Sequence, residues 1–140
     1  MSFREKSTWI TFVLLLVVFG YYFVSVGAQM IRPVHPHTNF FMLFLVLLII
    51  IVVMEIVLHA IAASRSPGEA RKPQDERESL IALRAKRPAF FVLMTGVFMS
   101  VAVAHLGVGV WPLINAMVFA IWLGELTNFG AQLYYYRRET

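Results

Sequence analysis

The sequence predicts an all-α, polytopic membrane protein with four transmembrane helices in an antiparallel bundle. First, 59% of the 140 residues are hydrophobic and the mean hydropathy is +0.73, which is too apolar for a soluble domain. Second, the hydrophobic residues fall in four long blocks, and one polar run, residues 63–88, separates the first two blocks from the last two. We expect a single transmembrane domain, residues 1–140, with helices at about 8–28, 40–63, 89–110 and 113–136 and a cytoplasmic loop at 64–88.

The basic residues predict the orientation of these helices. Seven of the twelve Lys and Arg residues lie in the central polar run, and four more flank the first and last blocks. Arg32 alone lies in the loop between the first two blocks. Because Lys and Arg are retained on the cytoplasmic side of short loops, both termini and the central loop are expected in the cytoplasm.

Charge and composition also exclude several classes of function. The net charge is +4, but the basic residues lie beside hydrophobic segments, so anionic lipid head groups are the expected partner of the basic inner loop and nucleic acid is not. The chain has no cysteine, which excludes disulfides, thiolate metal sites and cysteine nucleophiles. It also has no nucleophile elbow and no glycine-rich phosphate loop, so we expect no enzyme and assign no cofactor.

The first segment, residues 8–28, is long enough to span the bilayer. Its 21 residues carry no charge and extend about 31 Å as a helix. Val26–Ala28 resembles a signal-peptidase site, but the apolar stretch before it is longer than a signal core, so we expect an uncleaved helix with Trp9 at the inner face. In the loop that follows, His35 and His37 could bind a metal ion, but two histidines without a third ligand favour a solvated loop.

The second segment, residues 40–63, carries two polar residues near its inner end. Glu55 and His59 are four positions apart and therefore share one face of the helix. A carboxylate is costly in lipid, so this face should contact other helices or water. After the segment, Pro67 and Pro73 interrupt the helix, and residues 74–87 form either a short amphipathic helix on the membrane surface or a charged entry turn.

The last two segments differ in their polar content. Residues 89–110 carry small side chains at every fourth position, a pattern that allows close helix packing, and a tight turn at 107–112 leads into the last segment. Residues 113–136 carry a polar stripe at spacings i, i+3 and i+7. The small residues are Gly96, Ser100 and Ala104, and the stripe is Glu125, Asn128 and Gln132.

The run Asp75–Glu78, together with Glu125 and the ending Gln132–Arg138, resembles a family of small four-helix bacterial and archaeal membrane proteins classed as a domain of unknown function. The resemblance covers mostly the second half of the chain. It implies a place in the bacterial or archaeal cytoplasmic (inner) membrane and a membrane-bound regulatory partner, and it implies no activity. The two halves also resemble each other, since each has one glutamate before a basic inner end, and this pattern would fit two parallel two-helix repeats.

The polar residues are predicted to lie at similar depths on the cytoplasmic side. At 1.5 Å per residue, Glu55 and Glu125 lie about 13 and 16 Å from the inner helix ends, and His59 and Asn128 about 7 and 12 Å. The cluster, with Gln132, either pairs helices or forms an ion or proton pathway. A metal centre is the least supported reading, because the Glu-x-x-His pairs of di-iron bundles and the histidine pair of zinc proteases are absent.

A binding module without transport is the other function class. Four short helices enclose little interior, so a homo-oligomer would cover the polar stripe and the small-residue face. The basic inner loop would then contact anionic lipids or a soluble cytoplasmic partner. We expect a membrane-embedded binding, regulatory or scaffold component, with small ion- or proton-coupled transport or ion binding as the alternative.

Overall fold

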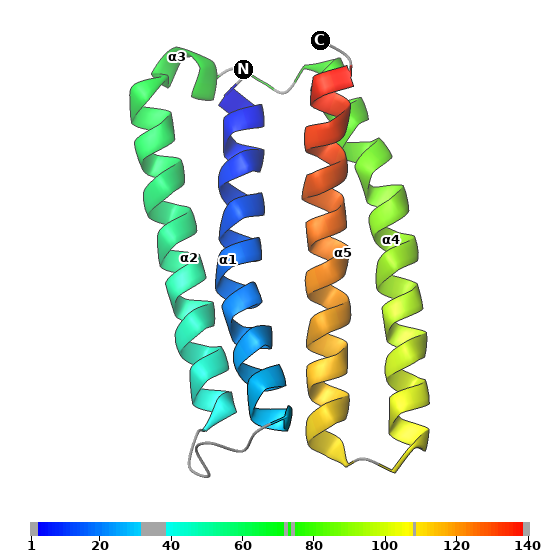
Figure 1. Cartoon of the computed structure of the whole chain (residues 1–140). Helices are drawn as coiled ribbons and strands as arrows, with labels where there is room; N and C mark the ends of the chain where they lie inside the picture. Colours follow the sequence, from blue (N-terminus) through cyan, green and yellow to red (C-terminus); the bar gives the residue numbers. More distant parts are fainter. Residues whose placement is uncertain (1–2, 32–38, 72, 74, 108, 139–140) are drawn as a thin grey trace. The chain divides into compact units, whose positions relative to one another are not determined.

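The computed structural model describes residues 3–31, 39–71, 73, 75–107 and 109–138, and the described residues form helices and turns without strands (Figure 1). Among the described residues, four helices are long and apolar enough to cross a membrane. The all-α membrane fold with four spanning helices is therefore confirmed. The helices are α1 (Phe3–Ile31), α2 (Phe40–Arg65), the short α3 (Pro67–Ala70), α4 (Glu76–His105) and α5 (Val110–Arg138).

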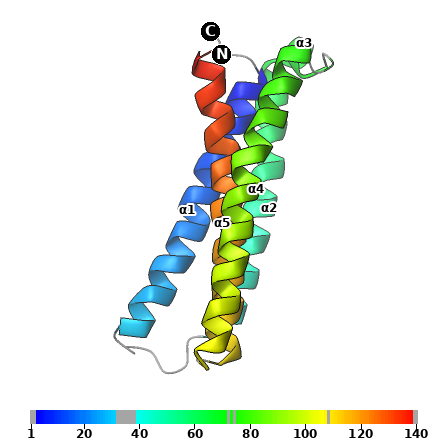
Figure 2. The same ribbon diagram turned by 90° about the vertical axis from the view of Figure 1, so that its right-hand side faces the viewer.

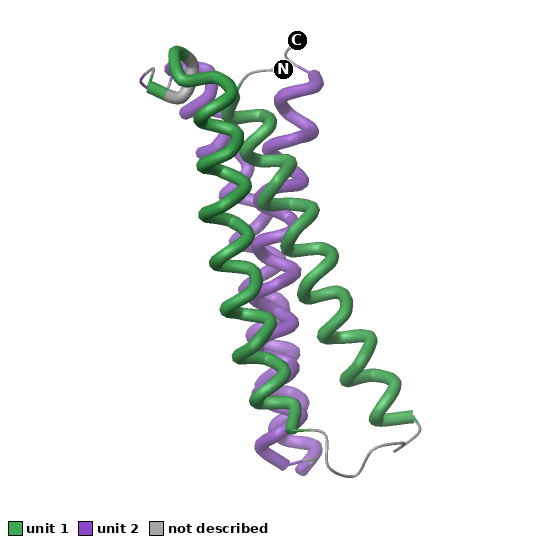
Figure 3. The backbone as a smooth tube through the Cα atoms, turned by 90° about the vertical axis from the view of Figure 1, so that its left-hand side faces the viewer, with its two compact units in different colours: residues 1–71 green, residues 72–140 purple. Residues whose placement is uncertain are grey.

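The chain divides into two compact units, residues 1–71 and 72–140, which are coloured separately in Figure 3. The first unit contains the antiparallel pair α1 and α2 together with α3, and the second contains the antiparallel pair α4 and α5.

In the first unit, α1 and α2 separate toward the ends that are joined by residues 32–38 (Figure 3). The Tyr22 ring contacts Phe44 across the pair, with ring centroids 5.8 Å apart. Asn39 caps α2, because its side-chain oxygen accepts a hydrogen bond from the Met42 amide at 3.2 Å. The two histidines considered for a metal ion, His35 and His37, lie outside the described residues.

In the second unit, α4 begins well before the expected start at residue 89. Asp75 caps it, and the helix continues through Pro88 to His105, so the surface helix or entry turn expected at 74–87 is the first part of one long helix. Proline fits helical φ and removes one backbone hydrogen bond. Ile81 and Ala85 are fully buried, so packing holds this part of the helix in place. At 1.5 Å per residue the 30 residues extend about 45 Å, more than the hydrocarbon core requires.

A short turn joins α4 to α5, which run side by side in Figures 1 and 2. Gly107 and Gly109 have φ values of 67° and 88°, a left-handed conformation that glycine adopts without strain. The expected segments ended at residue 110 and restarted at 113. In the structure α4 ends at His105 and α5 starts at Val110, because Pro112 is accepted within the first turn of a helix.

Candidate functional site

The structure brings Glu55 and His59 together on α2. The His59 Nδ1 lies 3.0 Å from Glu55 Oε2 and 2.8 Å from the backbone carbonyl oxygen of Glu55. A carbonyl oxygen can only accept a hydrogen bond, so Nδ1 must carry the proton and donate it. In the neutral ring, Nε2 is then left as an acceptor.

Two hydroxyl groups of α1 complete this network. His59 Nε2 lies 2.6 Å from Ser7 Oγ, and the Thr11 hydroxyl donates to Glu55 Oε2 at 3.1 Å. Nδ1 therefore donates to Glu55, and in the neutral ring Nε2 accepts from the Ser7 hydroxyl. Two i,i+4 pairs face each other across antiparallel helices, since Ser7 meets His59 and Thr11 meets Glu55. We call these four residues the α1·α2 polar network.

One acceptor in the network has no hydrogen-bond partner among the described residues. Glu55 Oε1 is buried, and the structure gives it no hydrogen bond within the described part of the chain. The Glu55 side chain as a whole is 27% exposed and that of His59 is 31% exposed. An unpartnered buried carboxylate oxygen is costly unless it takes up a proton or a cation. The network can thus bind the two helices together and can also accept a positive charge.

Sequence reasoning identified Glu55 and His59 but missed Ser7 and Thr11. Hydroxyl residues in a membrane helix usually donate to a carbonyl oxygen of their own helix, as Thr8 does to Arg4 at 2.9 Å. The available signal was spacing, because Ser7 and Thr11 repeat the four-residue interval of the α2 pair at a matching depth in the neighbouring helix. The expected start of the first segment at residue 8 placed Ser7 outside the helix, whereas α1 begins at Phe3.

The polar stripe of α5 is arranged differently. The Gln132 side-chain amide donates to Asn128 Oδ1 at 3.3 Å, so these two residues pair within one helix. Glu125 is exposed, and over the residues that the structure covers it has no hydrogen-bond or ion-pair partner. The stripe therefore leaves its carboxylate unpaired in the spanning part of α5.

Glu125 lies in a groove between α4 and α5 with a volume of about 280 Å³. Asn128 lies one turn further along the same groove, and Lys86 lines it from α4. No ion pair joins Lys86 to Glu125 in the described structure. The floor is close-packed, because a Cβ added at Gly124 would lie 3.2 Å from the Cβ of Leu93.

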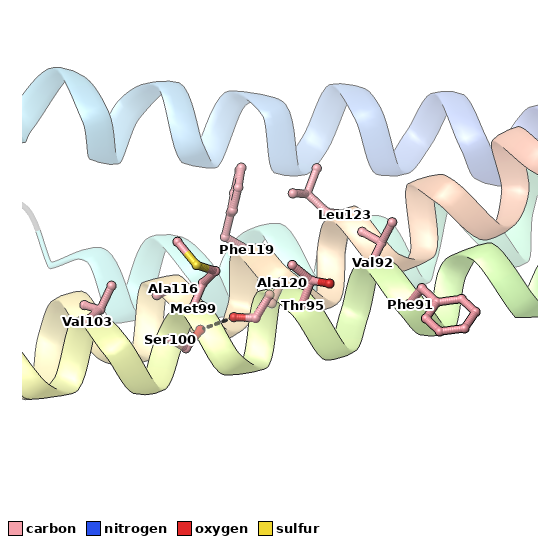
Figure 4. A pocket seen from close by; sticks show the side chains of 11 residues that line it. Phe91, Val92, Thr95, Met99, Ser100, Val103, Ala116, Phe119, Ala120 and Leu123 are labelled. Atoms are coloured by element: carbon pink, nitrogen blue, oxygen red, sulfur yellow. Dashed lines mark hydrogen bonds between the residues drawn. The ribbon is translucent and has the colours of Figure 1, made fainter.

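A second groove, of about 510 Å³, lies over the small residues of α4 (Figure 4). Gly96 lies directly against Ala120, since an added Cβ would be 2.5 Å from the Cβ of Ala120. Ser100 is buried and its hydroxyl donates to the Gly96 carbonyl oxygen at 2.8 Å, the dashed line in Figure 4. Ala104, the third small residue of the predicted stripe, is exposed.

The two grooves of the second unit lie on opposite sides of the helix pair. Phe119 and Leu123 line the larger groove, whereas Ile121 and Glu125 line the smaller one. At about 100° per residue, these two sets of positions lie on opposite faces of α5. The pair therefore presents one face that is almost wholly apolar and one that carries charge.

In the predicted cluster, Glu55 belongs to the first unit and Glu125 to the second. Each unit is described by itself, so their meeting stays a prediction. His105 is exposed and lies beside the Val101 carbonyl oxygen on its own helix. Within the described ranges, no group of three or more acidic, histidine or cysteine side chains is placed to hold a metal ion. Comparison of the chain with protein-family models, curated proteins and solved structures gave no significant match.

Proposed function

We propose that the protein is a membrane-embedded binding or scaffold component of a bacterial or archaeal cytoplasmic membrane, with both termini in the cytoplasm, and that it self-associates through the α4·α5 pair. The surface involved is the charged groove and its rim, which we call the Glu125 face. It consists of Lys86, Phe90, Ile121, Glu125 and Asn128.

The unpaired Glu125 carboxylate carries this proposal. Charged side chains in membrane spans are costly and face other helices or water-filled cavities. Leaving Glu125 exposed in the spanning part of α5 therefore calls for a partner surface that supplies hydrogen-bond donors or a positive charge.

A second copy of the chain meets that requirement. The Glu125 face carries both an anion, Glu125, and a cation, Lys86, and neither is paired in the described structure. In a twofold interface the same patch is used on both chains, so Lys86 of one copy can approach Glu125 of the other. Asn128 adds an amide donor on the same face.

The proposal is tested by native mass spectrometry of the full chain released from detergent, using charge-swap variants. Wild type is expected as an oligomer. Glu125→Lys and Lys86→Glu are each expected to shift the protein toward monomer, because each places like charges together. The double variant that carries both changes is expected to restore the oligomer, because it re-creates opposite charges across the interface.

Glu76→Lys is the matched control, since it makes the same charge change at an exposed position at the start of α4. It should leave the oligomer unchanged. If wild type is monomeric, or if the double variant is as dissociated as the single variants, self-association through this face is ruled out.

The α1·α2 polar network supports a second candidate, ion or proton binding coupled to transport. The specific observation is the buried Glu55 Oε1, which has no partner in the described part of the chain, beside a histidine whose other nitrogen faces Ser7. Hydrogen-bonded carboxylate and histidine side chains inside a membrane are the usual parts of a proton relay. Ser7, His59 and Glu55 form a continuous path of this kind along α1 and α2.

Proteoliposomes with an internal pH dye and an imposed potassium diffusion potential test this candidate. Proton entry above that of empty liposomes is expected for wild type and should disappear in Glu55→Gln. Glu125→Gln is the comparison, because it makes the same change outside the network. Equal dye signals from wild type, both variants and empty liposomes would eliminate the transport candidate and leave the network as a structural link between helices.

A further inference from the structure

The first unit contains a third pocket, of about 500 Å³, on one flank of the α1·α2 pair. Its apolar part is formed by Ile10, Leu58, Ile61 and Ala62, which lie at helical spacing on α1 and α2. Its volume falls within the usual range of small-molecule sites. All of its lining residues belong to the first unit.

Two cations stand at one end of this pocket. Lys6 comes from the first turn of α1 and Arg65 is the last residue of α2. Neither has an ion-pair or hydrogen-bond partner within the described ranges. Ser66 adds a hydroxyl group beside Arg65, and among the side chains that the structure describes no acidic one lines the pocket. The polar end is therefore complementary to an anion.

The position of the pocket relates this polar end to the membrane surface. The apolar residues lie further inside the two spanning helices than Lys6 and Arg65 do. Trp9 lines the pocket between the two regions, at the level where aromatic residues sit in the head-group zone. Along the expected membrane normal, the pocket thus begins with Lys6 and Arg65, continues with Trp9 and ends in its apolar part.

We propose that this pocket binds one anionic phospholipid, with its phosphate between Lys6, Arg65 and Ser66 and the upper part of an acyl chain against Ile10 and Leu58. Arginine and lysine are the side chains that bind phosphate groups, and an arginine fork can contact two of its oxygens. The site is separate from the Glu125 face. It rests on membrane insertion of α1 and α2 and does not require self-association.

Quenching of Trp9 fluorescence by brominated lipids tests the site in the full chain. The variant Trp111→Phe/Trp122→Phe keeps Trp9 as the only one of the three tryptophans. It is reconstituted in phosphatidylcholine vesicles that contain increasing fractions of phosphatidylglycerol brominated on its acyl chains. We expect half-maximal quenching at a mole fraction about 25-fold lower than with brominated phosphatidylcholine, since each of the two basic residues near an anionic surface contributes about fivefold.

Adding Lys6→Gln and Arg65→Gln should abolish the preference for phosphatidylglycerol. Quenching by brominated phosphatidylcholine should stay the same in this variant, which shows that Trp9 keeps its depth and that the protein is inserted. Arg71→Gln/Arg87→Gln removes the same charge from exposed positions outside the pocket and should change the preference less than about twofold.

Three results would overturn the proposal. The first is equal quenching by the two brominated lipids, and the second is an equal loss of preference in the control variant. The third is displacement of the lipid by millimolar inorganic phosphate, which would assign the polar end to free phosphate instead of a lipid. Because none of these readings depends on the oligomer, failure here would leave the Glu125 face untouched.

Discussion

The two helix pairs are held together by different side-chain chemistry. In the α1·α2 pair, hydrogen bonds cross between the helices, from Thr11 to Glu55 and between Ser7 and His59. In the α4·α5 pair, the helices approach so closely at Gly96 that an added Cβ would collide with Ala120. The first pair separates toward the end that is joined by residues 32–38 (Figure 3), whereas the second is closely packed at Gly96 and again at Gly124.

Because of this difference, the polar residues of the first pair link its two helices, whereas Glu125 in the second pair does not. Small residues allow van der Waals packing in the membrane without hydrogen bonds between helices, so α5 does not need Glu125 to hold α4. Its carboxylate is available for a partner. In the first pair, Glu55 Oε2 already accepts hydrogen bonds from Thr11 and His59, and only Oε1 is left without a partner in the described structure.

The largest expected effect is on the close approach in the second pair. Gly96→Ile should destabilise the protein by about 3 kcal/mol, because the added atoms must push α4 away from Ala120. The free energy of unfolding can be measured by titration with SDS in mixed micelles. Gly20→Ile is the control, since a Cβ at Gly20 has no neighbour within 4 Å, and it should change stability by less than about 0.5 kcal/mol. Equal losses in both variants would contradict the packing account.

The second-largest effect on stability is expected from removing the Glu55 carboxylate, the central acceptor of the α1·α2 pair. Glu55→Leu should cost about 2 kcal/mol in the same titration, because Thr11 and His59 each lose a partner. Glu55→Gln keeps an acceptor oxygen and should cost clearly less. A Glu55→Leu variant that is as stable as wild type would show that the network does not hold the pair together.

Two threonines on α1 provide a matched comparison of smaller size. Thr11→Val should cost about 1 kcal/mol, because Thr11 bonds to the other helix, whereas Thr8→Val should cost almost nothing, because Thr8 bonds to a carbonyl oxygen of α1. In a double-mutant cycle, Thr11→Val should add little once Glu55→Leu is present. Additive losses would mean that the two side chains do not act on each other.

The smallest effect is expected in the polar stripe of α5. Asn128 pairs with Gln132 on its own helix, so Asn128→Leu should change the free energy of unfolding by no more than about 0.5 kcal/mol. A loss of 2 kcal/mol or more would indicate that Asn128 links α5 to α4 within the pair. The two pairs would then be more alike than the structure shows.

Much of the fold could be predicted from hydropathy and charge, because a membrane span needs a long apolar helix and little else. The early start of α4 could not, because an amphipathic stretch before Pro88 is equally compatible with a separate surface helix. Glu55 and His59 were found because charged groups are rare in spans. Ser7 and Thr11 were missed because hydroxyl residues are common there and their partners depend on which helices are neighbours.

Cross-linking in native membranes tests self-association through the Glu125 face most directly. The chain contains no cysteine, so Ile121→Cys reports on the Glu125 face and Phe119→Cys on the opposite groove, both at exposed positions of α5. With a short bis-maleimide, we predict covalent dimers of Ile121→Cys that disappear when Glu125→Lys is added, and few dimers of Phe119→Cys. Equal dimer yields at the two positions, or dimers of Ile121→Cys that persist with Glu125→Lys, would contradict the account.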